Sequence, residues 1–123
     1  MPDFSKSSRK ALATAHPELQ RLFNEVIKTF DCKVVCGHRG RADQDKAFAD
    51  GFSKVQWPKS KHNKVPSLAV DVAPFPSMFK DVSKFHDLAV VVKETAKRLG
   101  IKVTWGGDWK NFKDLPHWQI DAE

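Results

Sequence analysis

The spacing of apolar residues predicts two amphipathic helices. The first begins near Pro17, because proline suits the first helical turn. Its apolar positions recur every three or four residues, at Leu19, Leu22, Phe23, Val26, Ile27 and Phe30. The second is predicted over Ser83–Leu99, with Ser83 as its N-cap and Gly100 as its end.

Shorter apolar runs between turn residues predict four strands. These strands are Cys32–Gly37, Ser67–Val72, Ile101–Trp105 and Pro116–Ile120. Two shorter helices are predicted over Ser5–Ala13 and Arg41–Asp50, and the basic stretch Phe52–Pro66 is predicted to be a loop. Helices come first and then mix with strands without regular alternation. This order predicts an α+β fold with a small, mostly antiparallel sheet flanked by helices.

Alternation within the predicted strands assigns their residues to faces. Along Ser67–Val72 the apolar side chains occupy every second position, which leaves Asp71 on the face away from the core. In the last strand, His117 and Gln119 share the face opposite Trp118 and Ile120. The sequence therefore predicts polar residues on one side of the sheet.

The length and charge of the chain indicate how many domains it has and what kind of partner it binds. A length of 123 residues predicts one domain, residues 1–123. The net charge of +6 favours a polyanionic partner such as a nucleic acid, an anionic membrane or a cell wall. No run approaches the ~18 apolar residues of a membrane span, so no membrane insertion is expected. The polar, basic start of the chain predicts no signal peptide, and therefore synthesis in the cytoplasm.

The two cysteines are predicted to stay reduced. Cys32 and Cys36 lie four residues apart on a predicted strand, which separates them by about 13 Å at ~3.3 Å per residue. A disulfide requires a Cα separation below about 7 Å.

Two histidines with carboxylates nearby are the main candidates for chemistry. His62 precedes Asp71, and His117 follows Asp114 by three residues. Two imidazoles and one carboxylate are a common ligand set for a catalytic zinc with one open position. Taken singly, however, each of these residues is also compatible with a packed or solvated role. Arg39, between two glycines, can likewise be either a substrate-binding arginine or a solvated one.

In combination, the motifs carry a family resemblance. The three segments are Ser60-Lys61-His62, Ser67-Leu68-Ala69-Val70-Asp71 and Asp114-Leu115-Pro116-His117. They resemble the family of zinc D-Ala-D-Ala carboxypeptidases and L-alanyl-D-glutamate endopeptidases, which includes vancomycin-resistance dipeptidases and phage endolysins. Val35–Arg39 with Gln44, and Trp105–Trp109, resemble stretches of the phage branch. The spacer between His62 and Asp71 is longer than in the common motif, and Ser67 occupies the glycine position.

The resemblance implies a fold and roles for individual residues. It implies the hedgehog/DD-peptidase fold, zinc bound by His62, Asp71 and His117, and Asp114 as the catalytic acid and base. Arg39 would stabilise the transition state. The residues implied to support the site or bind substrate are Ser60, Gln44, Trp105 and Trp109.

The resemblance also implies a function. The expected substrate is the peptidoglycan stem peptide, cut at the L-Ala-D-Glu bond by a monomeric endolysin that reaches the periplasm and cell wall after a holin opens the membrane. One alternative is a D-Ala-D-Ala carboxypeptidase or dipeptidase with the same centre. Others are a basic nucleic-acid-binding protein or nuclease, and a non-catalytic zinc module. For the favoured peptidase no stable nucleic-acid partner is expected.

Overall fold

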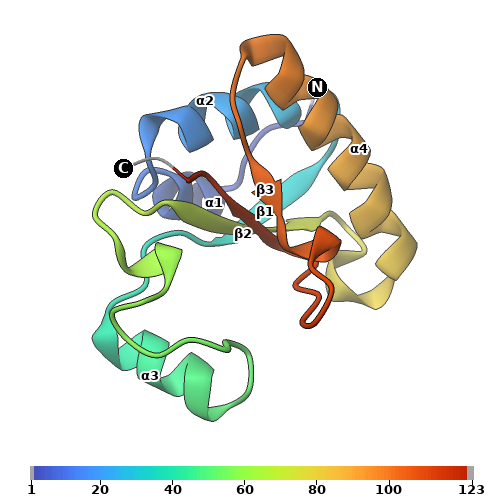
Figure 1. The fold of residues 1–123 in the computed structure, drawn as a ribbon. Helices are drawn as coiled ribbons and strands as arrows, with labels where there is room; N and C mark the ends of the chain where they lie inside the picture. The colour runs from blue at the N-terminus through green and yellow to red at the C-terminus, as the bar shows by residue number, and fades with distance from the viewer. Residues whose placement is uncertain (1, 122–123) are drawn as a thin grey trace.

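The computed structural model describes residues 2–121 and has an α+β fold (Figure 1). One four-stranded sheet has the order β1-β2-β4-β3, and each neighbouring pair of strands is antiparallel. Its strands are β1 (Cys32–Cys36), β2 (Ala69–Pro74), β3 (Thr104–Trp105) and β4 (His117–Gln119). The predicted fold class, with a small antiparallel sheet flanked by helices, is confirmed.

Residues 2–121 also form four α-helices and three short 3-10 helices, of which α1 and α2 precede the first strand. The α-helices are α1 (Lys6–Leu12), α2 (Pro17–Val26), α3 (Arg41–Ala49) and α4 (Val82–Leu99). The 3-10 helices are η1 (Lys61–Asn63), η2 (Met78–Lys80) and η3 (Gly106–Asp108). Figure 1 shows α2 and α4 on the same side of the sheet, while α3 projects away from it.

The hydrophobic core lies between the sheet and helices α2 and α4. Phe23 of α2 and Val92 of α4 are fully buried in it. Trp118 of β4 meets Phe23 edge-on at 6.4 Å between ring centroids and stacks on Trp105 of β3 at 5.7 Å. The apolar face predicted for α2 is therefore the face that packs on the sheet.

Strand β2 separates this core from a polar face. Val70 and Val72 belong to the core cluster, whereas Asp71 between them faces the opposite side and is partly exposed. In the antiparallel register Asp71 lies opposite His117 of β4. The face predicted for Asp71 is confirmed, and β-sheet pairing brings the second histidine to the same place.

The boundaries of several elements differ from the predictions. Helix α4 begins one residue earlier than predicted because Asp81, rather than Ser83, caps it: Asp81 Oδ1 accepts a 3.0 Å hydrogen bond from the Ser83 amide. Strand β2 runs on to Pro74, which pairs with Cys32 at the start of β1. The predicted strand Ile101–Trp105 is reduced to β3.

Both cysteines are free, as predicted, with Cys32 buried and Cys36 partly buried. Burial raises the pKa of the Cys32 thiol to about 12, and the charge of Asp31 adds to the effect. None of the helices in residues 2–121 combines the length and the apolar character needed to cross a membrane.

Candidate active site

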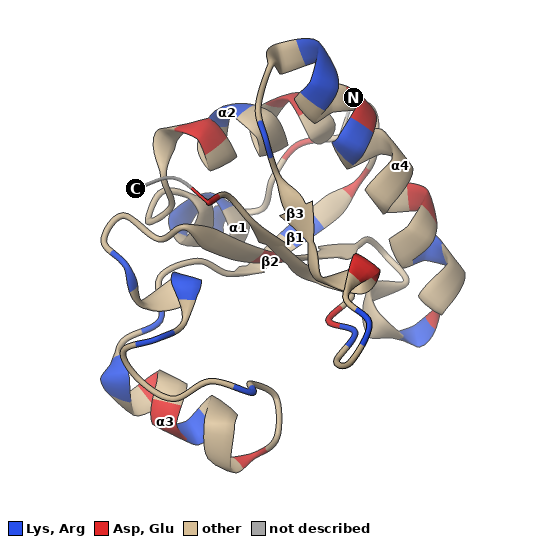
Figure 2. Ribbon diagram, viewed as in Figure 1, with Lys and Arg blue, Asp and Glu red and all other residues tan. Residues whose placement is uncertain are grey.

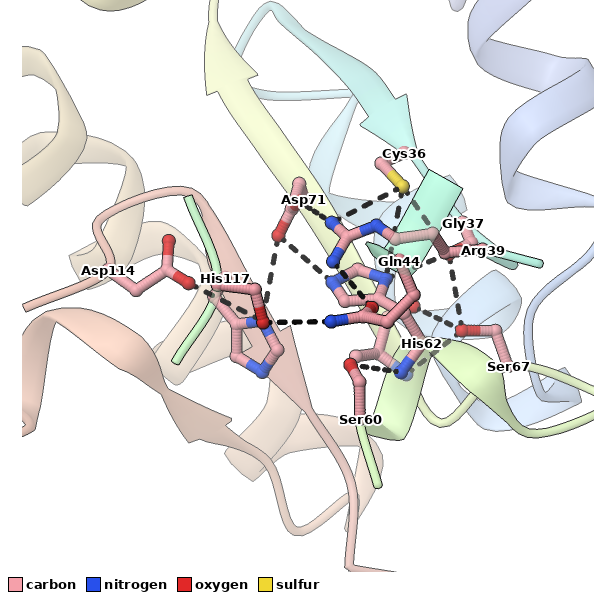
Figure 3. A network of polar contacts seen from close by, with 12 residues as sticks. Cys36, Gly37, Arg39, Gln44, Ser60, His62, Ser67, Asp71, Asp114 and His117 are labelled. Carbon is pink, nitrogen blue, oxygen red and sulfur yellow. Dashed lines mark hydrogen bonds and ion pairs between the residues drawn. The ribbon is translucent and has the colours of Figure 1, made fainter. Parts of the chain in front are cut away.

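Asp71 is the centre of a polar cluster on the face of the sheet away from the core (Figure 3). One of its oxygens, Oδ1, lies 3.2 Å from His62 Nε2 and 3.6 Å from His117 Nδ1. The pairing of β2 with β4 positions His117, and helix η1 positions His62. Three residues that the sequence predicted as metal ligands therefore converge on one point.

The outer nitrogen of each imidazole is already occupied. His62 Nδ1 lies 2.8 Å from the Gly37 carbonyl oxygen, and His117 Nε2 lies 2.8 Å from Gln119 Oε1. Both partners are acceptors, so these nitrogens carry the hydrogens and donate. The inner nitrogens, His62 Nε2 and His117 Nδ1, are consequently the ones available to a metal.

The donor set suits a zinc ion. Two imidazole nitrogens and a carboxylate are typical zinc ligands, and each imidazole has the outer hydrogen bond that usually orients a metal-binding histidine. Two groups of possible metal ligands share Asp71: one adds Cys36 and His62, and the other adds Asp114 and His117. The Cys36 sulfur lies 4.0 Å from His62 Nδ1, the nitrogen that already donates to Gly37. The predicted set of His62, Asp71 and His117 takes one histidine from each group and the aspartate that both groups share.

Charge pairing helps to hold the cluster together. Burial opposes ionisation of Asp71, but its hydrogen bonds to His117 and His62 outweigh burial and lower the Asp71 pKa. Burial also disfavours the charged form of His62, but the hydrogen bonds with Asp71 and Cys36 outweigh it and raise the His62 pKa to about 10. A metal must displace the proton on His62, so metal binding is expected to weaken as the pH falls.

Asp114 lies beside the predicted ligands without pairing closely to them. Its Oδ2 is 3.9 Å from His117 Nδ1, and its side chain is 24% exposed. Burial, followed by the negative charge of Asp71, raises the pKa of Asp114. A carboxyl group with a raised pKa, next to a site that can hold a metal, is suited to taking up and returning a proton.

Arg39 is held on the other side of Asp71. Its Nη2 lies 3.3 Å from Asp71 Oδ2, and its Nη1 donates a 3.0 Å hydrogen bond to Gln44 Oε1. Gln44 is the buried residue of α3. Its amide nitrogen donates to Ser53 Oγ at 2.9 Å and to the Val55 carbonyl at 2.7 Å. Gln44 thus links Arg39 to the segment that follows α3.

The other predicted site residues lie in different surroundings. Ser60 caps η1, since its hydroxyl accepts a 3.2 Å hydrogen bond from the His62 amide. Trp109 is partly exposed, and its ring centroid is 5.0 Å from that of His117. Trp105 is buried in the core, where its indole N–H donates to the Leu115 carbonyl at 2.7 Å. Trp109 can meet a substrate, whereas Trp105 supports the sheet.

The two departures from the family motif are accommodated locally. Ser67 is fully buried, and its hydroxyl donates to the Ala69 carbonyl at 2.6 Å, so a side chain fits in the glycine position. The longer spacer forms an exposed turn over residues 64–66, between η1 and β2, where Val65 is 84% exposed. Neither departure displaces His62 or Asp71 from the cluster.

A cavity of about 520 Å³ opens over the cluster. Arg39, His62, Asp71, Asp114 and His117 all contribute to its lining. The remaining lining residues are Val35, Phe52, Ser53, Lys54, Val55, Lys59, Ser60, Lys61, Phe79, Trp109, Phe112, Pro116 and Gln119. The cavity combines a polar floor with a largely apolar and basic rim.

Three orienting groups were not among the residues predicted for the site. They are Gln119, the Gly37 carbonyl and Asn63, whose amide donates to the Arg39 carbonyl at 3.0 Å. The alternation of residues in the last strand placed Gln119 on the same face as His117, so the sequence could have identified Gln119 as a neighbour of the site. Backbone carbonyls such as that of Gly37 have no signal of their own in a sequence.

We expect Gly37→Ala to destabilise the protein and weaken metal binding. A Cβ atom at Gly37 would lie 2.3 Å from both the Ala11 carbonyl oxygen and Thr14 Oγ1. Moving the chain to relieve this clash would also move the carbonyl that orients His62. Overpacking of this kind costs about 1–3 kcal/mol.

The check is thermal unfolding together with a zinc titration, and Gly40→Ala is the control. A Cβ atom at Gly40 meets nothing within 4 Å, and its backbone φ of −76° is open to any residue. Equal stability of the two variants would contradict the expected clash.

Comparisons with known proteins agree with the resemblance carried by the motifs. The sequence model of the family described as phage L-alanyl-D-glutamate peptidase matches residues 2–121. The L-alanyl-D-glutamate peptidase of Escherichia phage T5 is 34% identical over 117 residues, covering 90% of this chain and 84% of the phage protein.

Two further relatives are bacterial. The peptidoglycan L-alanyl-D-glutamate endopeptidase CwlK of Bacillus subtilis (strain 168) is 32% identical over 111 residues, covering 76% of this chain and 62% of the Bacillus protein. The crystal structure of the L-Ala D-Glu endopeptidase ChiX of Serratia marcescens superposes with a TM-score of 0.81 at 30% identity, covering 97% of this chain and 90% of that protein. The fold and the sequence therefore indicate the same family.

Proposed function

Because the chain belongs to the phage L-alanyl-D-glutamate peptidase family, we propose that it cleaves the L-Ala-D-Glu bond of peptidoglycan stem peptides at a zinc centre. The observation that carries the proposal is the convergence of His62 Nε2 and His117 Nδ1 on one oxygen of Asp71, with Asp114 beside them. The cavity over this cluster is large enough for a peptide segment.

His62, Asp71 and His117 would hold the zinc ion. When bound, zinc supplies Lewis acidity, which polarises a carbonyl group and makes a water molecule easier to deprotonate near neutral pH. The Gly37 carbonyl and Gln119 orient the two imidazoles through their outer nitrogens. The protein therefore contributes a fixed, pre-oriented set of ligands.

Asp114 and Arg39 would carry out the protein's part of the reaction. Asp114 takes a proton from the attacking water and returns it to the leaving amine, a role that its raised pKa supports. Arg39 lines the cavity next to Asp71 and places a permanent positive charge near the reacting carbonyl. Gln44 holds the Arg39 guanidinium in this position.

The biological setting follows from the same proposal. Residues 1–123 would act as one catalytic peptidase domain, as a monomer, in phage-induced lysis of the host. The enzyme would be made in the host cytoplasm and reach the cell wall when a holin opens the membrane. The basic net charge of +6 supports attraction to an anionic wall.

Product analysis of digested peptidoglycan tests this function. The protein is incubated with purified sacculi with zinc or with a chelator, and the released ends are identified by mass spectrometry. New N-terminal D-Glu that requires zinc is the expected result. Release of terminal D-Ala instead would identify a carboxypeptidase with the same centre, and the absence of any product would contradict a peptidase.

We expect Gln119→Leu to weaken zinc binding by about 10–100-fold. Gln119 Oε1 accepts the hydrogen bond from His117 Nε2, and its amide nitrogen donates to Asp121 Oδ1 at 3.0 Å, which fixes the orientation of the amide. Leucine is close in size but cannot accept this bond, so the His117 ring loses its preferred orientation.

The measurement is a competition titration of zinc against a chromophoric chelator. Gln119→Glu is the matched variant, since a carboxylate restores the acceptor, and it is expected to keep or increase the affinity for zinc. If Gln119→Leu bound zinc as tightly as the unmodified protein, Gln119 would have no orienting role.

A further inference from the structure

We propose that Lys54 and Lys59 form a subsite for the carboxylates of the stem peptide on the D-Glu side of the bond that is cut. This inference rests on the proposed function and extends it to substrate recognition. Both lysines line the cavity over the Asp71 cluster. The chain between Gly51 and Leu68 contains four lysines and no Asp or Glu, and Figure 2 shows this basic stretch between α3 and β2.

The charges that line the cavity are unevenly distributed. Its carboxylates within residues 2–121, Asp71 and Asp114, belong to the proposed active site, and Arg39 is paired with Asp71. Lys61 lies 3.9 Å from Asp121. Within residues 2–121, Lys54 and Lys59 have no carboxylate partner. Positive charge is therefore in excess on the side of the cavity formed by residues 52–61.

Hydrogen bonds hold this segment in a defined position. Gln44 binds the Ser53 hydroxyl and the Val55 carbonyl, the residues on either side of Lys54. The amide of Ser60, which follows Lys59, donates to Asn63 Oδ1 at 3.0 Å. The Lys54 ammonium also lies 5.1 Å from the centroid of the Phe112 ring, which lines the same cavity. The backbone that carries both lysines is thus fixed relative to Arg39, because Gln44 bonds both Arg39 and this segment.

The chemistry of the substrate is complementary to this surface. D-Glutamate has two carboxyl groups, and the peptide chain uses one of them to join the next residue. The other is a free carboxylate unless it has been amidated. The L-Ala residue on the other side of the bond has only a methyl side chain. Anionic groups near the bond therefore lie on the D-Glu side. Two lysines without carboxylate partners would attract the D-Glu carboxylate and so bind this side of the substrate.

Paired substrates and paired variants test the subsite. The substrate is a short peptide with the L-Ala-D-Glu bond, blocked at both ends, in which the free D-Glu carboxyl group is either ionised or converted to an amide. The variant is Lys54→Met with Lys59→Met, which keeps the apolar part of each side chain and removes two charges. The control is Lys10→Met with Lys97→Met, which removes two exposed charges elsewhere on the protein.

At low salt we expect the Lys54/Lys59 variant to raise KM for the free-acid peptide about tenfold, since each exposed ion pair contributes a modest amount. We expect its kcat, and both constants for the amidated peptide, to change less than about twofold, as in the control variant. Unchanged KM for the free acid, or an equal rise for both peptides, would overturn the subsite. If the unmodified zinc-loaded protein cleaved neither peptide, the proposed function itself would fail.

Discussion

Replacing Asp114 with alanine is expected to lower the rate of peptide hydrolysis by at least about a thousandfold while zinc stays bound. Transfer of a proton by a positioned side chain typically contributes 10²–10⁴-fold to a rate. Among the residues that the structure describes, Asp114 is the one carboxylate in the cavity lining besides Asp71, which is held by two imidazoles and Arg39. No other described side chain lining the cavity can replace it as proton acceptor without giving up a metal-binding role.

The measurement combines the hydrolysis rate with the zinc content of the same preparation. Asp108→Ala is the matched control, because Asp108 is an exposed aspartate that pairs with Lys93 at 2.7 Å outside the cavity. The control is expected to retain nearly full activity. If the Asp114→Ala protein hydrolysed the substrate at a rate close to that of the unmodified protein, Asp114 would have no role in proton transfer.

Asp71→Asn is expected to eliminate tight zinc binding and, with it, activity. The substitution preserves the shape of the side chain but removes the charge that faces His62, His117 and Arg39. Loss of a group that only orients a ligand already costs about 10–100-fold in metal affinity, so loss of a charged ligand should cost at least a hundredfold. The three cationic or protonatable side chains would also face one another without an anion between them.

Zinc affinity and thermal stability should be measured together for this variant. Zinc that binds the folded protein raises its Tm, and this increase should be present in the unmodified protein and absent from Asp71→Asn. The Asp108→Asn variant controls for the loss of one negative charge. If Asp71→Asn kept both the zinc content and the increase in Tm, Asp71 would not be a ligand.

The spacing of apolar and polar residues along the sequence predicted those features of the fold that depend on residues close together in the chain. The alternation around Asp71 and the apolar spacing along α2 identified the correct faces, because burial on one side of a strand or helix leaves a period in the sequence. The family motifs then brought together residues as distant as His62 and His117. These two features account for the fold class and for the composition of the predicted site.

The remaining features depend on contacts that leave no local pattern. Asp81, rather than Ser83, caps α4, and the position of the cap depends on the path of the preceding chain. Gln44 looks like an ordinary helical glutamine until α3 is placed against Arg39 and residues 53–55. The fit of Ser67 in the glycine position depends on space next to Gly37 and Ala69.

The exposed turn over residues 64–66 also bears on how such enzymes can be recognised and modified. Because these residues lie between η1 and β2, outside both elements, their number can vary without moving His62 or Asp71. Lengthening a flexible loop costs little free energy. Searches that demand a fixed interval between the two motifs would overlook enzymes with the same site. For the same reason this exposed turn is a suitable insertion point for a short peptide tag outside the core.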